Sequence, residues 1–242
     1  MSEEGAMEGV DYVIAQHVDP TRPVGTISIS AGPSSGGVDS WHAVVKGKGG
    51  HGAHPNKTID PFYLTAHVII ALNAIISRRI DPFDPAVVSI GSINGGFAEN
   101  VIPEEAKITG TLRFTDEAVH QQIYAEIKRA FEIVKTLGGD YELRYDVGGP
   151  PMINDKFVTE MIERTGADLL GADNVREHQK SLGAEDFGEF MKHAPGAMYT
   201  LGTQKAGHED YLLHHPKFDI DERAMPIGTA MLAETAKRFL QG

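Results

Sequence analysis

Apolar residues along the chain alternate between a spacing typical of strands and a spacing typical of helices. Residues 25–30 (GTISIS) alternate as in a half-buried strand, and residues 11–18 (DYVIAQHV) form a short β-rich run. From 61 to 79 the apolar residues recur every three or four positions, which predicts a helix with Pro61 in its first turn. The pattern therefore favours a mixed α/β protein.

The middle of the chain, residues 38–149, contains expected elements in the order β-α-β-β-α-β. Its second helix is predicted to begin at Thr115 as N-cap and to end at Gly138. This order is typical of a split βαβ, ferredoxin-like unit. The other expected elements are strands at 40–49, 86–90, 106–114 and 140–147 and the helix at 61–79.

The flanking residues, 1–37 and 150–242, are predicted to form one partial α/β domain that the ferredoxin-like domain at 38–149 interrupts. The Gly/Ser/Pro cluster at 31–37 reads as a linker, and the turn GGPP at 148–151 reads as the second boundary. Further elements are expected as helices at 155–170 and 221–240, a short helix after Gly183 and a strand at 197–201.

Composition and charge narrow the range of functions. The net charge is -12 and no run of Lys or Arg occurs, so nucleic acid and anionic membranes are poor candidate partners. No signal-peptide pattern is visible, and we expect a cytoplasmic location. The chain has no cysteine, which excludes disulfides, thiolate chemistry and every Cys-based zinc site. Any metal ion must therefore be held by histidine and carboxylate ligands.

Three histidines lie where metal ligands are often found. His17 closes a predicted strand, and α/β sheets place their ligands at strand ends. A hydrogen-bonded histidine with no further role is the alternative there. His214 and His215 precede the last predicted helix, in a loop that Pro216 stiffens. Solvated loop histidines are the alternative for this pair.

The glycine-rich loop at 44–55 (VVKGKGGHGAHP) has two histidines but no established motif. It lacks the Gly-Lys-Ser/Thr ending of a phosphate-binding loop, and Pro55 and the glycines prevent the helix that a paired-histidine zinc motif needs. A mobile loop that delivers an imidazole, such as that of His51, to a carbonyl oxygen is one interpretation. A flexible turn without chemistry is the other.

Four further residues could contribute polar chemistry. Asn100 lies in AENVIP, and Arg113 in TLRF ends a predicted strand, where its planar fork could bind a carboxylate. A surface ion pair is the alternative for Arg113. The pair Glu185–Asp186 precedes a short predicted helix and could either cap it or support a nearby site.

Several long motifs, in this order, carry a resemblance to a known family. They are VVKGKGGHGAHP, SIGSINGG, AENVIPEEAKITGTLRF, LGAEDFGEF and LHHPKFDIDERAMPIGTAML. Together they resemble the M20 metallopeptidases, in the branch of aminoacylases, carboxypeptidases, and hippurate and auxin-conjugate hydrolases. The resemblance implies an α/β catalytic domain with a two-metal site of zinc or manganese. It also implies a ferredoxin-like lid that forms a homodimer, and N-acyl amino acid or peptide substrates.

The resemblance also implies roles for individual residues. His17 and His214 look like metal ligands, although His215 occupies a position where the family usually has a small residue, so the choice between His214 and His215 stays open. His51 looks like the lid histidine that stabilises the oxyanion, in some relatives from the partner subunit. Asn100 and Arg113 look like lid residues that contact the substrate.

Two stretches of the family have no match in this chain: the His-x-Cys/Asp-Gly-His-Asp stretch and the Pro-x-Glu-Glu stretch with the general-base glutamate. The resemblance therefore implies the C-terminal part of such an enzyme, and we expect little or no amide hydrolysis from this chain alone. The alternative is a non-catalytic dimerisation or binding module. An incomplete parallel sheet has an open edge, so we also expect dimerisation, capture of a partner or marginal stability.

Overall fold

The structure is a computed structural model that describes residues 4–208 and 210–241. The chain divides into two compact units. The second unit is Gly36–Pro151 together with Leu182–Ala184, and the first unit contains the remaining residues. The sequence predicted boundaries at 37/38 and 149/150, and it assigned residues 182–184 to the first unit.

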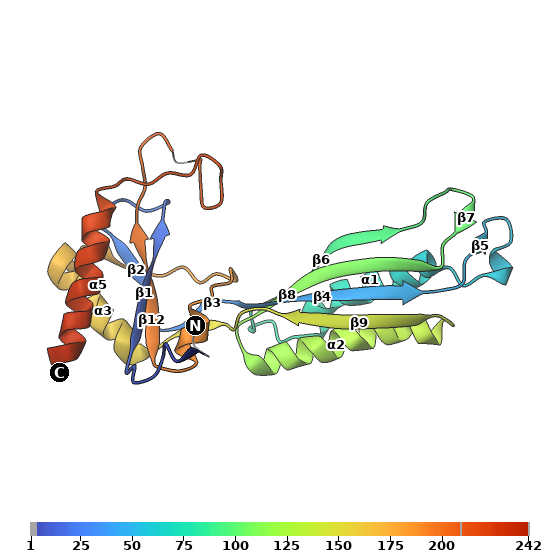
Figure 1. Cartoon of the computed structure of the whole chain (residues 1–242), viewed down its shortest axis with the longest axis horizontal. Helices are drawn as coiled ribbons and strands as arrows, with labels where there is room; N and C mark the ends of the chain where they lie inside the picture. Colours follow the sequence, from blue (N-terminus) through green and yellow to red (C-terminus); the bar gives the residue numbers. More distant parts are fainter. Residues whose placement is uncertain (1–3, 209, 242) are drawn as a thin grey trace. The chain divides into compact units, whose positions relative to one another are not determined.

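The second unit is a four-stranded antiparallel sheet with two helices on one face (Figure 1). The strand order is β6-β8-β4-β9, and the chain order β-α-β-β-α-β matches the ferredoxin-like expectation. The elements are β4 (Gly37–Lys46), α1 (Pro61–Arg79), β6 (Ala86–Gly95), β8 (Glu105–Phe114), α2 (Glu117–Thr136) and β9 (Asp140–Val147).

The core of the second unit follows from strict alternation along β4. Every second residue of this strand is buried, so that Trp41, Ala43 and Val45 face the helices. The Trp41 ring meets the ring of Phe131 from α2 edge-on, with centroids 6.0 Å apart. Burying one apolar side chain of this kind stabilises the folded state by about 1.5–3 kcal/mol relative to leaving it exposed. The helices therefore cover the face of the sheet that carries these side chains.

Among the described residues, α1 is the one helix long and apolar enough to cross a membrane by length and composition. Core helices of soluble domains pass the same test. In this structure Leu64, Val68, Leu72 and Ile75 of α1 are buried in the core of the second unit. We therefore assign α1 to that core.

The helix starts agree with the sequence in one case and correct it in the other. Pro61 is in the first turn of α1, and the Asp60 carboxylate accepts the N–H of Phe62. The N-cap predicted at Thr115 is wrong: Asp116 caps α2 and accepts two backbone N–H groups there. The charged carboxylate of Asp116 also interacts favourably with the positive end of the helix dipole.

The first unit has a mixed four-stranded sheet with strand order β1-β12-β2-β11. β1 and β12 are parallel, β12 and β2 are antiparallel, and β2 and β11 are parallel. Figure 1 shows α3 and α5 on one face of this sheet. The elements are β1 (Val13–Asp19), β2 (Ile27–Ile29), α3 (Lys156–Leu170), β11 (Val175–Glu177), α4 (Gly188–Met191), β12 (Gly196–Gly202) and α5 (Ala224–Gln241).

Short strands that the sequence did not predict connect the larger elements. The predicted linker at 31–37 contains β3 (Gly32–Ser35), which pairs antiparallel with β10 (Met152–Asn154). Two segments far apart in sequence form this ribbon, so no local pattern could reveal it. The remaining short pair is β5 (Gly50–His51) with β7 (Val101–Ile102).

Candidate metal and substrate site

His17 lies on β1, two residues before the strand ends, and is half-buried. Its ring Nδ1 lies 2.8 Å from the backbone carbonyl oxygen of Val18. A carbonyl oxygen can only accept, so Nδ1 carries the proton and donates it. The lone pair of the neutral His17 ring is therefore on Nε2, the nitrogen that remains able to bind a metal ion.

The loop that carries His214 starts and ends beside the end of β1. At its start, Thr203 donates its N–H to the carbonyl oxygen of Asp19 at 2.9 Å. At its end, Asp221 donates its N–H to the carbonyl oxygen of Thr203 at 3.1 Å. Figure 1 shows this loop, in orange, beyond the tips of β1 and β12. His17 and the base of the His214 loop are therefore at the same edge of one sheet.

The structure distinguishes the two adjacent histidines of the loop. His215 Nδ1 accepts the backbone N–H of Lys217 at 3.0 Å, and its ring stacks on Tyr211 with centroids 4.7 Å apart. A neutral His215 ring therefore carries its proton on Nε2 and has no lone pair free for a metal ion. Among the described residues, His214 is the only residue other than glycine with a positive backbone φ, at 68°. Backbone conformations of this kind cluster at functional sites.

Two ion pairs brace the same loop. Lys205 bonds to the carboxylate of Asp219 and lowers the pKa of that group. The Arg223 side chain donates to Asp221, with Nε and Oδ1 2.9 Å apart, and lowers the pKa of Asp221 to about 2. Both carboxylates are therefore ionised at neutral pH and bonded to cations of their own loop.

His51 and Asn100 lie together at the short β5–β7 pair of the second unit. Gly52 donates its N–H to the carbonyl oxygen of Asn100 at 2.8 Å. His51 Nδ1 accepts the N–H of Ala53 at 3.0 Å, so the proton of the neutral ring is on Nε2. The exposed His51 ring can thus donate a hydrogen bond, as an oxyanion requires, whereas the His17 ring can bind a metal ion.

Arg113 lies in the same unit as His51 and Asn100 but at the other end of β8. It is half-buried near the strand's C-terminal end and opposite Val38 of β4, while the β5–β7 pair precedes the strand's first residue, Glu105. Arg113 lies eight residue steps after Glu105, or about 27 Å along the strand at the usual rise. Within one chain, Arg113 and His51 are thus too far apart to contact one small substrate.

Glu185 and Asp186 organise a turn. Glu185 Oε1 accepts the N–H of Phe187 at 3.3 Å, and the carbonyl oxygen of Asp186 accepts the N–H of Glu189 at 2.9 Å. Both contacts belong to the approach to the short helix α4. The Glu185 carboxylate therefore holds the N-cap residue, Phe187, and the Asp186 contact is made by its backbone.

The possible metal ligands of this chain account for only part of a metal site. Within residues 4–208 and 210–241, no group of three or more His, Asp or Glu side chains is arranged to hold a metal ion. A catalytic zinc or manganese centre needs at least three protein ligands, and a two-metal centre also needs bridging carboxylate. His17 and His214 can therefore contribute imidazoles to such a centre, but the described residues do not complete one.

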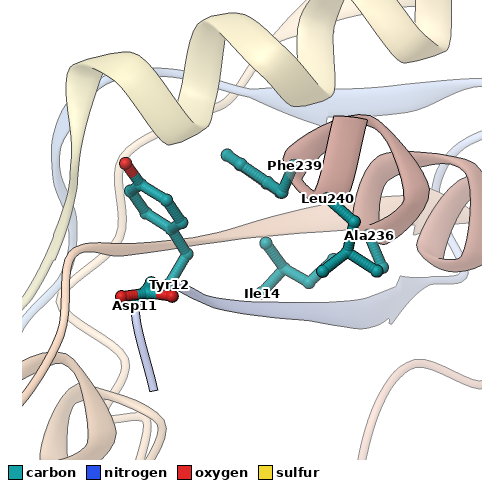
Figure 2. Close-up of a pocket in the computed structure, with 6 residues that line it drawn as sticks. All are labelled: Asp11, Tyr12, Ile14, Ala236, Phe239 and Leu240. Carbon is teal, nitrogen blue, oxygen red and sulfur yellow. The ribbon is translucent and has the colours of Figure 1, made fainter. Parts of the chain in front are cut away.

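A pocket of about 280 Å³ lies at the opposite end of β1 (Figure 2). Tyr12 stacks on Phe239 of α5 there, with ring centroids 4.8 Å apart. Apart from Asp11 the lining is mainly apolar and includes none of the predicted site residues, so we do not place the chemistry here. The lining residues are Asp11, Tyr12, Ile14, Ala236, Phe239 and Leu240.

Sequence reasoning missed the residues that anchor the site loop. Asp19 binds the turn after β1 through its carboxylate, which accepts the N–H of Thr21 at 2.9 Å, and it binds the His214 loop through its carbonyl oxygen. The Asp-Pro pair after a predicted strand was the available signal, because Asp before Pro favours a turn. The partner Thr203 is distant in sequence and had no signal of its own.

Comparison with known proteins extends these observations. Residues 34–135 match the family model of the peptidase dimerisation domain. The chain is 35% identical over 246 residues to thermostable carboxypeptidase 1 of Saccharolobus solfataricus, covering 99% of this chain and 61% of the relative. It is 35% identical over 242 residues to N-acetyl-L-cysteine deacetylase of Bacillus subtilis, covering 98% and 56%.

A solved structure with the same fold is the YxeP protein of Bacillus subtilis, a dinuclear metal-binding peptidase of the M20 family. It matches with a TM-score of 0.82 and 29% identity, over 99% of this chain and 60% of that chain. The predicted fold class, an α/β domain interrupted by a ferredoxin-like unit, is thereby confirmed.

Fold and similarities together define the class: an α/β domain with an inserted dimerisation domain. The chain is similar to M20-family proteins over nearly its whole length, which confirms the resemblance seen in the sequence. It spans about three fifths of the length of the curated relatives it matches.

Proposed function

We propose that this chain is part of a metal-dependent amidohydrolase that cleaves the amide bond of N-acyl amino acids or short peptides, using zinc or manganese. The deacetylase and carboxypeptidase activities of its relatives and the dinuclear metal binding of a structural neighbour support this proposal. The observation that carries it is the His17 ring, whose Nε2 lone pair is free beside the anchored base of the His214 loop. A cytoplasmic location stays a prediction from composition.

Each predicted residue has a role consistent with its geometry. His17 and His214 hold the metal, and His214 is preferred to His215 because a neutral His215 ring has its Nδ1 lone pair bonded to Lys217 and its proton on Nε2. Bound metal ions would supply Lewis-acid polarisation of the amide and activation of water. His51 donates from Nε2 to the oxyanion. Arg113 and Asn100 bind the substrate.

We propose that the working form is a homodimer. Arg113 and His51 are separated by most of β8, so two copies are needed if both residues serve one substrate. The match of residues 34–135 to a dimerisation domain supports the same arrangement. The contact surface would combine the open edge of β6 with exposed apolar residues of the adjacent α1, such as Tyr63 and Ile70.

Metal titration by calorimetry tests the ligand assignment. We expect the chain to bind Zn²⁺ or Mn²⁺ weakly, and both His17→Ala and His214→Ala to reduce the affinity at least tenfold, because each removes a metal–nitrogen bond. His215→Ala is the matched control and should change the affinity less than threefold. Loss of affinity in His215→Ala equal to that in His214→Ala would contradict the assignment, as would unchanged affinity in His17→Ala.

Activity assays with acetyl- and hippuryl-amino acids test the second part of the proposal. We propose that the 242-residue chain alone has at most trace activity, because its described residues do not complete a metal site. Robust metal-dependent turnover by the isolated chain would contradict this. Dimers that bind no metal ion would favour the alternative, a non-catalytic dimerisation or binding module.

A further inference from the structure

A buried carboxylate at the start of β4 accepts hydrogen bonds from three donors, which lie in two other segments of the second unit. Asp39 is 1% exposed. Its Oδ2 accepts from His120 Nε2 at 2.6 Å and from the Tyr124 hydroxyl, both on α2. Its Oδ1 accepts the backbone N–H of Gly148 at 2.9 Å. One side chain thus joins β4, α2 and the turn after β9.

These contacts lie where the chain enters and leaves the second unit. Val38 donates its N–H to the carbonyl oxygen of Gly149 at 2.9 Å, so the entering and leaving strands are also bonded directly. The packing is tight: a Cβ on Gly37 would lie 2.5 Å from the Phe114 ring, and one on Gly148 would lie 2.3 Å from the Val38 carbonyl oxygen. The glycines therefore permit the close approach that the carboxylate stabilises.

The surroundings keep the three donors in place. The His120 ring stacks on Phe114 with centroids 3.8 Å apart and planes 7° apart, and its Nδ1 lies 3.2 Å from the exposed Glu117 carboxylate. Burial and the bond to Asp39 raise the pKa of Tyr124, so its hydroxyl stays a donor at any physiological pH. A buried carboxylate with three donors is stable only while all three stay in position.

We propose that Asp39 is a positioning residue that clamps the entering and leaving strands of the second unit into one rigid ribbon. The clamp is a conformational device of the fold, and the inference does not depend on the proposed hydrolase activity. Sequence motifs gave no sign of it, because Asp39 and its partners lie 81 to 109 positions apart.

Hydrogen exchange of the full chain, read at single amides, tests the clamp. Asp39→Asn keeps the size of the side chain but removes its charge and one acceptor. We expect the Val38 amide, which does not touch the Asp39 side chain, to exchange at least tenfold faster in this variant. Amides in the middle of the sheet, at Val45 and Ile108, should change less than threefold. An unchanged rate at Val38 would overturn the proposal.

A uniform rise in exchange at Val38, Val45 and Ile108 would also overturn it, because that result means general destabilisation. Tyr124→Phe removes one donor and keeps the ring, so it provides a milder test if Asp39→Asn does not fold; we expect a threefold or larger rise confined to Val38. The matched control is Asp146→Asn, an exposed carboxylate on β9, which should leave the Val38 rate within twofold.

Discussion

Single hydrogen bonds give the histidines of this chain different chemical capacities. His17 donates from Nδ1 to a carbonyl oxygen, so its neutral ring has a free lone pair on Nε2. His51 and His215 accept backbone N–H groups at Nδ1, so their neutral rings carry the proton on Nε2. The residue type is the same in all three cases, and the neighbouring backbone group decides between ligand and donor.

His178 yields a prediction about acid stability. It follows β11, and burial lowers the pKa of its ring below the ordinary 6.5. The unfolded chain therefore binds the proton at a higher pH than the folded chain, and stability falls as the pH drops below about 6.5 toward the folded-state pKa. We expect His178→Gln to reduce this loss between pH 7 and 5.5, by at most about 1.4 kcal/mol per pH unit.

Urea unfolding followed by circular dichroism at several pH values measures the effect of His178→Gln. The exposed His193→Gln is the matched control for the loss of one imidazole. If the wild type and His178→Gln lose stability equally between pH 7 and 5.5, the buried ring does not contribute to acid sensitivity. The backbone N–H of residue 178, which bonds to the Ser30 hydroxyl at 3.0 Å, is the same in both proteins.

Among the elements, β8 depends on one glycine for its place in the sheet. A Cβ on Gly110 would lie 2.0 Å from the Ser89 carbonyl oxygen and 2.3 Å from the ring of Trp41. Because Trp41 is fully buried in a close-packed core, moving either neighbour aside would cost free energy of folding. A glycine inside a strand has no side chain to pack, and the close neighbours of Gly110 explain why one occurs there.

Gly110→Ala should destabilise the second unit by about 3 kcal/mol, as overpacking of a tight core does. The fluorescence of Trp41, the only tryptophan of the chain, reports urea unfolding of this unit directly. Gly91→Ala is the matched control, because its Cβ would meet only the Thr109 carbonyl oxygen, at 3.8 Å, and its effect should be below about 1 kcal/mol. Equal destabilisation by Gly110→Ala and Gly91→Ala would show that the tight packing around Gly110 is not the reason a glycine is needed there.

For the whole molecule, the proposed dimer predicts a mass near twice the 26.2 kDa of one chain in light scattering. Ile70 is 71% exposed on α1, and Ile70→Asp should weaken association at least tenfold by adding a charge to the contact. Leu169→Asp, on α3 of the first unit, is the matched control and should leave association within threefold. A wild-type monomer at all concentrations would contradict the proposed dimer.

The sequence pattern indicated the candidate histidines of the site but could not distinguish between the two in the loop. His17 was recognisable because it ends a predicted strand, and His214 and His215 because Pro216 follows them before a helix. The proposed preference for His214 over His215 depends on a bond from Lys217 and on a backbone angle. Neither the hydrogen bond nor the backbone angle can be predicted from the residue pattern.

The sequence by itself determined the element order and the face of each major element that is buried, because periods of two and of three to four residues are properties of the local backbone. Only the tertiary structure decided the pairing of β3 with β10, the anchoring of the His214 loop to Asp19, and the clamp on Asp39. These contacts join segments far apart in the chain. Their geometry depends on packing that no local period encodes.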